Sequence, residues 1–224
     1  MAKLAGFLLA AFAVLLALPA PSVANDPDML QDICVADYKS LKGRNTEVER
    51  VPVQEARERD GKRLLEQRVG EARQHGQRGG SAVTAANVEK LPGLNTLGVS
   101  MSRIDFAPWG VNPPHTHPRA TEMILVVEGS LDVGFVTTAN KLVARTIRKG
   151  EAFVFPRGLV HYQRNNAHSP ALVISAFNSQ LPGTQSVAET LFGASPAVPS
   201  DVLARAFQID GGLVKGIKSK FPHK

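Results

Sequence analysis

His115-Thr-His117-Pro-Arg-Ala-Thr-Glu122 is the stretch that decides the fold, together with Gly150-Glu-Ala-Phe-Val-Phe-Pro-Arg-Gly-Leu-Val-His161 further along the chain. Side chains two residues apart on a strand point to the same face, so His115 and His117 can both aim inward. Glycines stand near both segments where turns would fall. The pattern therefore predicts that three imidazoles and one carboxylate meet at one point.

The residues around these two segments predict short β-strands separated by turns. Glu128-Gly129, Lys149-Gly150 and Pro156-Arg-Gly158 are turn signals, and the runs between them are apolar or rich in β-branched residues. The predicted strands are 122–127, 131–136, 141–147, 152–155 and 171–177. Two sheet segments would thus carry the four candidate ligands.

A set of three histidines and one glutamate offers three nitrogens, one oxygen and no sulfur. Such a set suits manganese, iron, zinc or nickel better than calcium or copper(I). Four protein ligands in an octahedral shell leave two positions open, which is typical of a catalytic metal site. A lone His-x-His would more commonly belong to a surface loop, but here Glu122, His161 and the turn residues complete one pattern. Asn165 fits either a structural turn amide or a partner behind a ligand.

Several segments resemble the plant germin-like proteins of the cupin superfamily. They are Asn112–Glu122, Gly150–His161, Phe177–Gln185, Leu30–Asp37 and Leu203–Ile209. The resemblance implies a mainly β fold, a cupin jelly-roll β-barrel with C-terminal α-helices. It also implies manganese (Mn2+) held by His115, His117, Glu122 and His161. A homo-oligomer, a hexamer built from dimers, and a secreted protein of the apoplast and cell wall with a role in defence are further implications.

Two residues depart from the family pattern. Trp109 stands where glycine is usual, and we expect its ring near the mouth of the barrel. Asn112 matches an asparagine that contacts substrate in oxalate-oxidising germins, whereas Ser102 replaces a second such asparagine. Asn112 is therefore expected to line the open metal positions.

The resemblance and these departures favour superoxide dismutase-type chemistry, in which the metal alternates between two oxidation states. Oxalate oxidase activity, which produces hydrogen peroxide, is the enzymatic alternative, and the missing second amide argues against it. A non-enzymatic cell-wall or receptor-like binding protein is the other alternative.

Residues 1–24 read as a secretory signal peptide, because one lysine precedes an apolar run and Ser22-Val-Ala24 is a small-residue cleavage site. We predict an N-terminal arm at 25–80, a β-barrel at 81–182 and a helical extension at 183–224. No other segment predicts a membrane span. The formal net charge of +6 suits a small anion such as superoxide or oxalate, and no nucleic-acid-binding motif is present.

Residues 43–80 differ in composition from the rest, being rich in charge and free of Phe, Tyr and Trp. Cys34 is the single cysteine, whereas germin-like proteins pair its equivalent with a second cysteine downstream. Codons can be assigned so that reading one base later restores family-like sequence, including that cysteine. We hypothesise that 43–80 is a frame-shifted segment; the alternative is a charged helix over 55–73, which would leave Cys34 free.

Apolar residues change phase between Met101 and Ile104, which predicts a β-bulge at Ser102-Arg103. Further along, the sequence period changes from strand to helix. Helices are predicted over 185–192 and 200–207, followed by a basic amphipathic tail over 213–221 that suits packing within an oligomer.

Overall fold

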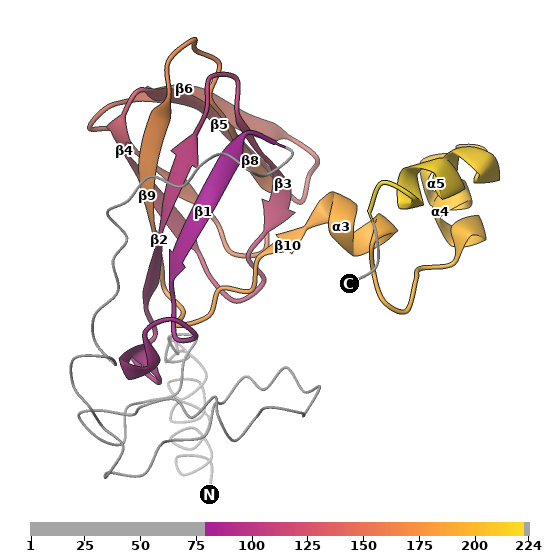
Figure 1. The fold of residues 1–224 in the computed structure, drawn as a ribbon, viewed down its shortest axis with the longest axis horizontal. Helices are drawn as coiled ribbons and strands as arrows, with labels where there is room; N and C mark the ends of the chain where they lie inside the picture. Colours follow the sequence, from indigo (N-terminus) through magenta and orange to yellow (C-terminus); the bar gives the residue numbers. More distant parts are fainter. Residues whose placement is uncertain (1–78, 222–224) are drawn as a thin grey trace, which may run out of the picture.

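The computed structural model describes residues 79–221 and contains two antiparallel sheets that face one another (Figure 1). One sheet has the strand order β1-β2-β9-β4-β7 and the other the order β10-β3-β8-β5-β6. The strands are β1 (Ser81–Ala86), β2 (Ser100–Phe106), β3 (Val111–Thr116), β4 (Glu122–Glu128), β5 (Ser130–Val136), β6 (Leu142–Arg148), β7 (Ala152–Phe155), β8 (His161–Arg164), β9 (Ala171–Phe177) and β10 (Gln185–Ser186). The predicted mainly β fold is confirmed, including the five strands expected from sequence.

Alternation along the strands builds the core between the two sheets. In β4, Ile124 and Val126 are buried, whereas Met123 and Leu125 point outward and are exposed. This period of two places every second residue on the inner face. The buried cluster also draws on both sheets and consists of Ile104, Phe106, Ile124, Val126, Leu131, Val133, Ile147, Phe155, Ala171 and Val173.

The bulge predicted at Ser102-Arg103 is wrong. Strand β2 pairs without interruption with β1 and with β9. Ser100 and Ser102 lie on the same buried inner face as Ile104, whereas Met101 is exposed. The phase of the apolar residues changes because serines occupy inner positions, not because the strand slips. Register shifts lie elsewhere in the described residues, in β3 between Asn112 and His115 and in β4 between Val126 and Glu128.

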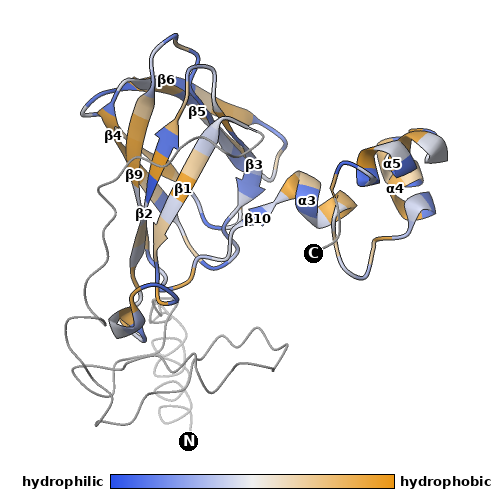
Figure 2. Ribbon diagram, in the orientation of Figure 1, coloured by the Kyte–Doolittle hydropathy of each residue, from blue (hydrophilic) through white to orange (hydrophobic). Residues whose placement is uncertain are grey.

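Three short helices follow the barrel and extend away from it (Figures 1 and 2). They are α3 (Val187–Phe192), α4 (Ser200–Phe207) and α5 (Gly211–Lys218). The predicted helices are confirmed, except that residues 185–186 of the first one form β10. The Ser186 hydroxyl caps α3, and the Asp210 carboxylate caps α5. Phe192, Leu203 and Val214 form a small apolar core of their own. None of the helices within 79–221 is long and apolar enough to cross a membrane.

The predicted signal peptide, the predicted N-terminal arm with Cys34 and the charged segment up to residue 78 lie outside the described residues. The predicted domain boundaries and the hypothesis of a frame shift therefore remain predictions. Only the last two residues of the charged segment are described. Backbone carbonyls of Gly79 and Gly80 accept hydrogen bonds from Val111 and Ala107.

Candidate metal centre

The four candidate ligands come from both sheets. His115 is on β3 and lies opposite His161, the first residue of β8, in the strand register. Glu122 begins β4 in the facing sheet, where it is paired with Phe155 and Phe177. His117 follows the end of β3. The site thus lies between the two sheets, at the end of the barrel where these strands start or stop.

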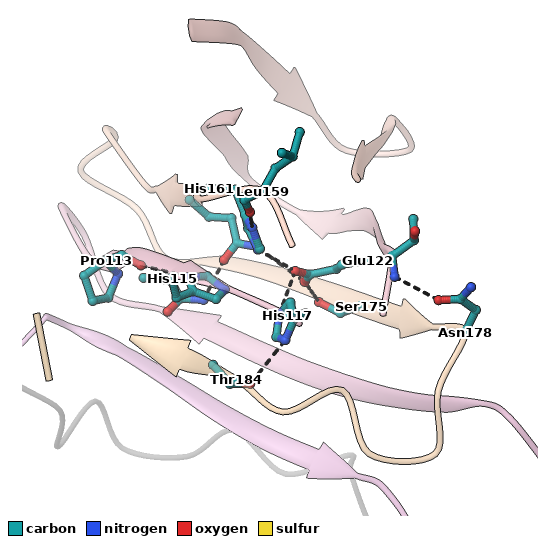
Figure 3. A network of polar contacts seen from close by, with 12 residues as sticks. Pro113, His115, His117, Glu122, Leu159, His161, Ser175, Asn178 and Thr184 are labelled. Atoms are coloured by element: carbon teal, nitrogen blue, oxygen red, sulfur yellow. Dashed lines mark hydrogen bonds and ion pairs between the residues drawn. The ribbon is translucent and has the colours of Figure 1, made fainter. Parts of the chain in front are cut away.

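The structure brings all four side chains together. One ligand atom from each of His115, His117, Glu122 and His161 lies within 4.8 Å of the others, and all four residues are buried. Figure 3 shows the three imidazoles turned toward the carboxylate. This is a group of side chains that can hold a metal ion.

Backbone carbonyls fix the orientation of two imidazoles. Nδ1 of His115 lies 2.8 Å from the carbonyl oxygen of Pro113, and Nδ1 of His161 lies 2.8 Å from that of Leu159. A carbonyl only accepts, so each Nδ1 carries the proton and each Nε2 is left as a metal ligand. His117 differs, since its Nδ1 lies 3.4 Å from the Thr184 hydroxyl.

Burial and charge set the protonation of the site. Burial, followed by the neighbouring His161, lowers the pKa of His115 from 6.5 to about 4. Burial alone would raise the pKa of Glu122, but the imidazoles of His117 and His161 beside it outweigh burial and hold the pKa of Glu122 well below the usual range. At neutral pH the site therefore presents a neutral His115 and an ionised carboxylate, the forms that bind metal.

The distances between ligand atoms fit a cation. Glu122 Oε2 lies 3.0 Å from His161 Nε2 and 3.2 Å from His117 Nε2. Since Nδ1 of His161 donates to a carbonyl, the Nε2 lone pair left for a metal faces an oxygen lone pair of the carboxylate. Such an approach is favourable only if a positive charge, a metal ion or an added proton, lies between them.

Aromatic rings support the imidazoles from the core side. The ring of Phe155 stacks on His161 with centroids 4.4 Å apart and an angle of 19° between planes. Phe177 meets His117 edge to face at 4.8 Å. Apolar walls exclude water from this side and so strengthen the electrostatic interactions within the site.

Three polar residues at the site were missed by sequence reasoning. Ser175 and Gln163 both donate to Glu122 Oε1, at 2.7 and 3.4 Å, and Thr184 contacts His117. Gln163 stands two residues after His161 and so shares its inward face, which was a usable signal. Ser175 is a hydroxyl in an otherwise apolar inner row of β9.

Asn112 lies behind the carboxylate in the hydrogen-bonded chain. Its side-chain amide donates to Gln163 Oε1 at 2.7 Å, and Gln163 in turn donates to Glu122. Its expected role in lining open metal positions remains a prediction.

Trp109, whose ring was expected near the mouth of the barrel, lies at the end of the barrel opposite the candidate ligands. It lies in the turn between β2 and β3, whereas His117 follows the opposite end of β3. The residue has φ of 63° and is 56% exposed, and its ring meets that of His168 edge to face at 4.8 Å. Glycine would adopt this backbone freely, so the tryptophan is strained there.

Asn165 also lies at that end of the barrel, and it is a structural amide. Its side-chain nitrogen donates to the carbonyls of Ala107 and Ser169, and its side-chain oxygen accepts from the backbone of Ala167. These bonds hold the β2–β3 turn against the β8–β9 loop. Of the two roles considered from sequence, the turn amide is the correct one.

Comparisons with known proteins agree with this fold and site. A family model described as cupin matches residues 67–215. Germin-like protein 1-3 of Oryza sativa subsp. japonica is 64% identical over 222 residues, covering 99% of this chain and 98% of that protein. Nectarin-1 of Nicotiana langsdorffii x Nicotiana sanderae is 60% identical over 199 residues, covering 88% and 84%.

Solved structures of oxalate oxidase, one with the substrate analogue glycolate, superpose with a TM-score of 0.80. They are 45% identical and cover 88% of this chain and 98% of the solved chain. The barrel and the buried histidine–glutamate group are those of a cupin. At this identity and coverage, the chain belongs to the germin-like proteins of that family.

Proposed function

We propose that the protein binds manganese at His115, His117, Glu122 and His161 and has superoxide dismutase-type activity. The observation that carries this proposal is the buried group of three imidazoles and one carboxylate, whose ligand atoms lie within 4.8 Å of one another. The donors include no sulfur, and this favours a hard or borderline ion such as manganese. The number of donors leaves room for a small ligand in an octahedral shell.

Bound manganese would supply the redox chemistry by alternating between two oxidation states. Overall, two superoxide anions and two protons become one dioxygen and one hydrogen peroxide. The residues of the chain hold the site ready for this reaction. Pro113 and Leu159 keep two imidazoles in one tautomer, and the buried carboxylate offsets positive charge. Asn112, which is half-buried and donates to Gln163, is the proposed amide lining the open positions.

Oxalate oxidation with release of hydrogen peroxide is the second candidate activity. It is favoured by the 45% identity to an oxalate oxidase that was solved with the substrate analogue glycolate. Ser102 argues against it, because a buried serine stands where those enzymes have an amide. A serine has fewer donors and a shorter reach than asparagine, so it would hold a dicarboxylate less firmly.

We further propose a secreted homo-oligomer, a hexamer, in the plant apoplast. The outer face of the β1-β2-β9-β4-β7 sheet supports association. Four exposed apolar residues lie side by side in register across four strands of this sheet. They are Met101, Ala176, Met123 and Val154. An apolar row of this kind on an outer sheet face is typical of an interface. Similarity to germin-like proteins supports the location.

Purified, manganese-loaded protein should be assayed for both activities in one preparation. We expect superoxide dismutation that depends on bound manganese and is lost in His115→Ala. Peroxide release from oxalate at a higher rate than dismutation would reverse the ranking of the two enzymes. Absence of both activities from protein with full manganese content would favour a cell-wall or receptor-like binding protein.

A further inference from the structure

The two carboxylate oxygens of Glu122 have different surroundings. Oε2 faces His161 and His117 at 3.0 and 3.2 Å, on the side where the ligand atoms converge. Oε1 points away from them and accepts hydrogen bonds from Ser175 Oγ at 2.7 Å and Gln163 Nε2 at 3.4 Å. The two oxygens therefore have separate tasks, and the shorter of the two bonds to Oε1 comes from Ser175 (Figure 3).

Ser175 is a polar residue on the otherwise apolar inner face of β9. On the inner face of β9 its neighbours along the strand are Val173 and Phe177, both buried, and Ser175 itself is fully buried. A buried hydroxyl without a hydrogen-bond partner is unfavourable, and the partner here is the carboxylate. In the strand register Ser175 lies opposite Ile124, which is two residues after Glu122. The Ser175 hydroxyl therefore reaches the side of the Glu122 carboxylate that carries Oε1.

We propose that Ser175 is a positioning residue that holds Oε1, so that Glu122 presents only Oε2 to the metal. This inference rests on the proposed metal binding. Without the Ser175 bond, Oε1 keeps only the longer bond from Gln163, and the carboxylate can rotate more readily about its soft terminal torsion. Both oxygens could then turn toward the metal and occupy a position otherwise left open. Hydrogen-bond partners behind a metal ligand commonly change metal affinity by about 10–100-fold.

Titration with the Mn2+ ion alone, and the electron paramagnetic resonance spectrum of the Mn2+-loaded protein, test this role. Ser175→Ala should bind manganese about 10–100-fold more weakly and show an altered spectrum. Ser175→Thr keeps the hydroxyl and should restore both properties. Ser100→Ala is the matched control, because it removes another inward serine of the barrel, one that donates to the carbonyl of Ser179 and not to Glu122. It should leave affinity and spectrum unchanged.

The outcomes separate this inference from the proposed function. Wild-type protein that binds no manganese would overturn both. Wild-type protein that binds manganese, with Ser175→Ala equal to it in affinity and spectrum, would overturn only the role of Ser175. Equal losses in Ser175→Ala and Ser100→Ala would show a general effect of removing a buried hydroxyl and would also overturn it.

Discussion

His161 shows how one residue joins the two halves of the site. Its Nδ1 is held by the carbonyl of Leu159, its ring stacks on Phe155, and its Nε2 faces Glu122. Each contact restricts a different freedom of the side chain: the tautomer, the tilt of the ring and the distance to the carboxylate. The imidazole is thus placed before any metal arrives, and preorganised ligands bind metal more tightly.

Replacement of His161 by alanine should abolish retention of manganese. Loss of a ligand is expected to exceed the roughly 10–100-fold effect of losing a partner behind one. Elemental analysis after dialysis measures the bound metal. His168→Ala is the matched control, because His168 is exposed and contacts Trp109 at the other end of the barrel. Full manganese content in His161→Ala would contradict the assigned ligand set.

Trp109 allows a test of backbone strain with two variants that lose the same ring. Its φ of 63° lies in the left-handed region, which costs a residue with a Cβ about 1–2 kcal/mol and glycine almost nothing. Trp109→Gly should therefore be more stable than Trp109→Ala by about 1 kcal/mol. Urea unfolding followed by far-UV circular dichroism compares them, and equal midpoints would show that the turn relaxes without strain.

At the scale of elements, the β2–β3 turn and the β8–β9 loop depend on one buried amide. Asn165 donates to Ala107 and Ser169 and also receives the backbone N–H of Ala167, so both connections close around a single side chain. The adjacent Asn166 is exposed and donates to Asp132 on β5. Of these two neighbouring asparagines, we therefore expect only Asn165 to contribute strongly to the stability of the fold.

Asn165→Ala should destabilise the protein by about 1–3 kcal/mol, because it removes a buried amide together with its hydrogen bonds to Ala107, Ser169 and Ala167. Asn166→Ala should change stability by less than about 0.5 kcal/mol, as is usual at exposed positions. Denaturant midpoints of the two variants measure the difference. Similar losses in both would mean that water replaces the buried amide of Asn165.

Local sequence patterns predicted the strands and helices, but they could not predict which residues contact one another across the sheets. The apolar run of β4, the turn at Gly129 and the start of α4 follow from short stretches of sequence. The four candidate ligands also followed from spacing. Ser175 and Thr184 did not, since their contacts depend on which strands lie beside β3 and β4. The buried serines Ser100 and Ser102 led to the wrong prediction of a bulge, because polar residues on the inner face reverse the usual alternation.

At the scale of the whole molecule, the outer face of one sheet carries exposed apolar side chains. Met123 is 51% exposed and lies between Ala176 and Val154 in the register. Figure 2 shows the apolar character of β4 and β9 in the ribbon. A single copy of the chain leaves this surface in contact with water, and a second copy would cover it.

Met123→Lys should shift the protein toward smaller assemblies, because it places a charge within the proposed apolar interface. Met123→Leu preserves the apolar surface and should retain the mass of the wild type. Size-exclusion chromatography with light scattering measures both. An unchanged mass for Met123→Lys would exclude this face from the interface.

Acid should destabilise the metal-free protein. His115 has a pKa of about 4 when folded and 6.5 ordinarily, so the unfolded chain binds more protons between these values. Stability is then lost as pH falls from about 6.5 toward 4, by about 3 kcal/mol for this group. The lowered pKa of Glu122 acts in the same direction below its ordinary value. Thermal melting at pH 7 and pH 4.5 tests this, and an equal Tm would refute it.

His115 and His161 belong to one sheet and Glu122 to the other. A metal ion held by all three would link the two sheets, and its ligands are buried side chains. We expect its release to require that ligands from both sheets let go of the ion. Exchange with metal in the medium should then be slow even where the equilibrium affinity is modest.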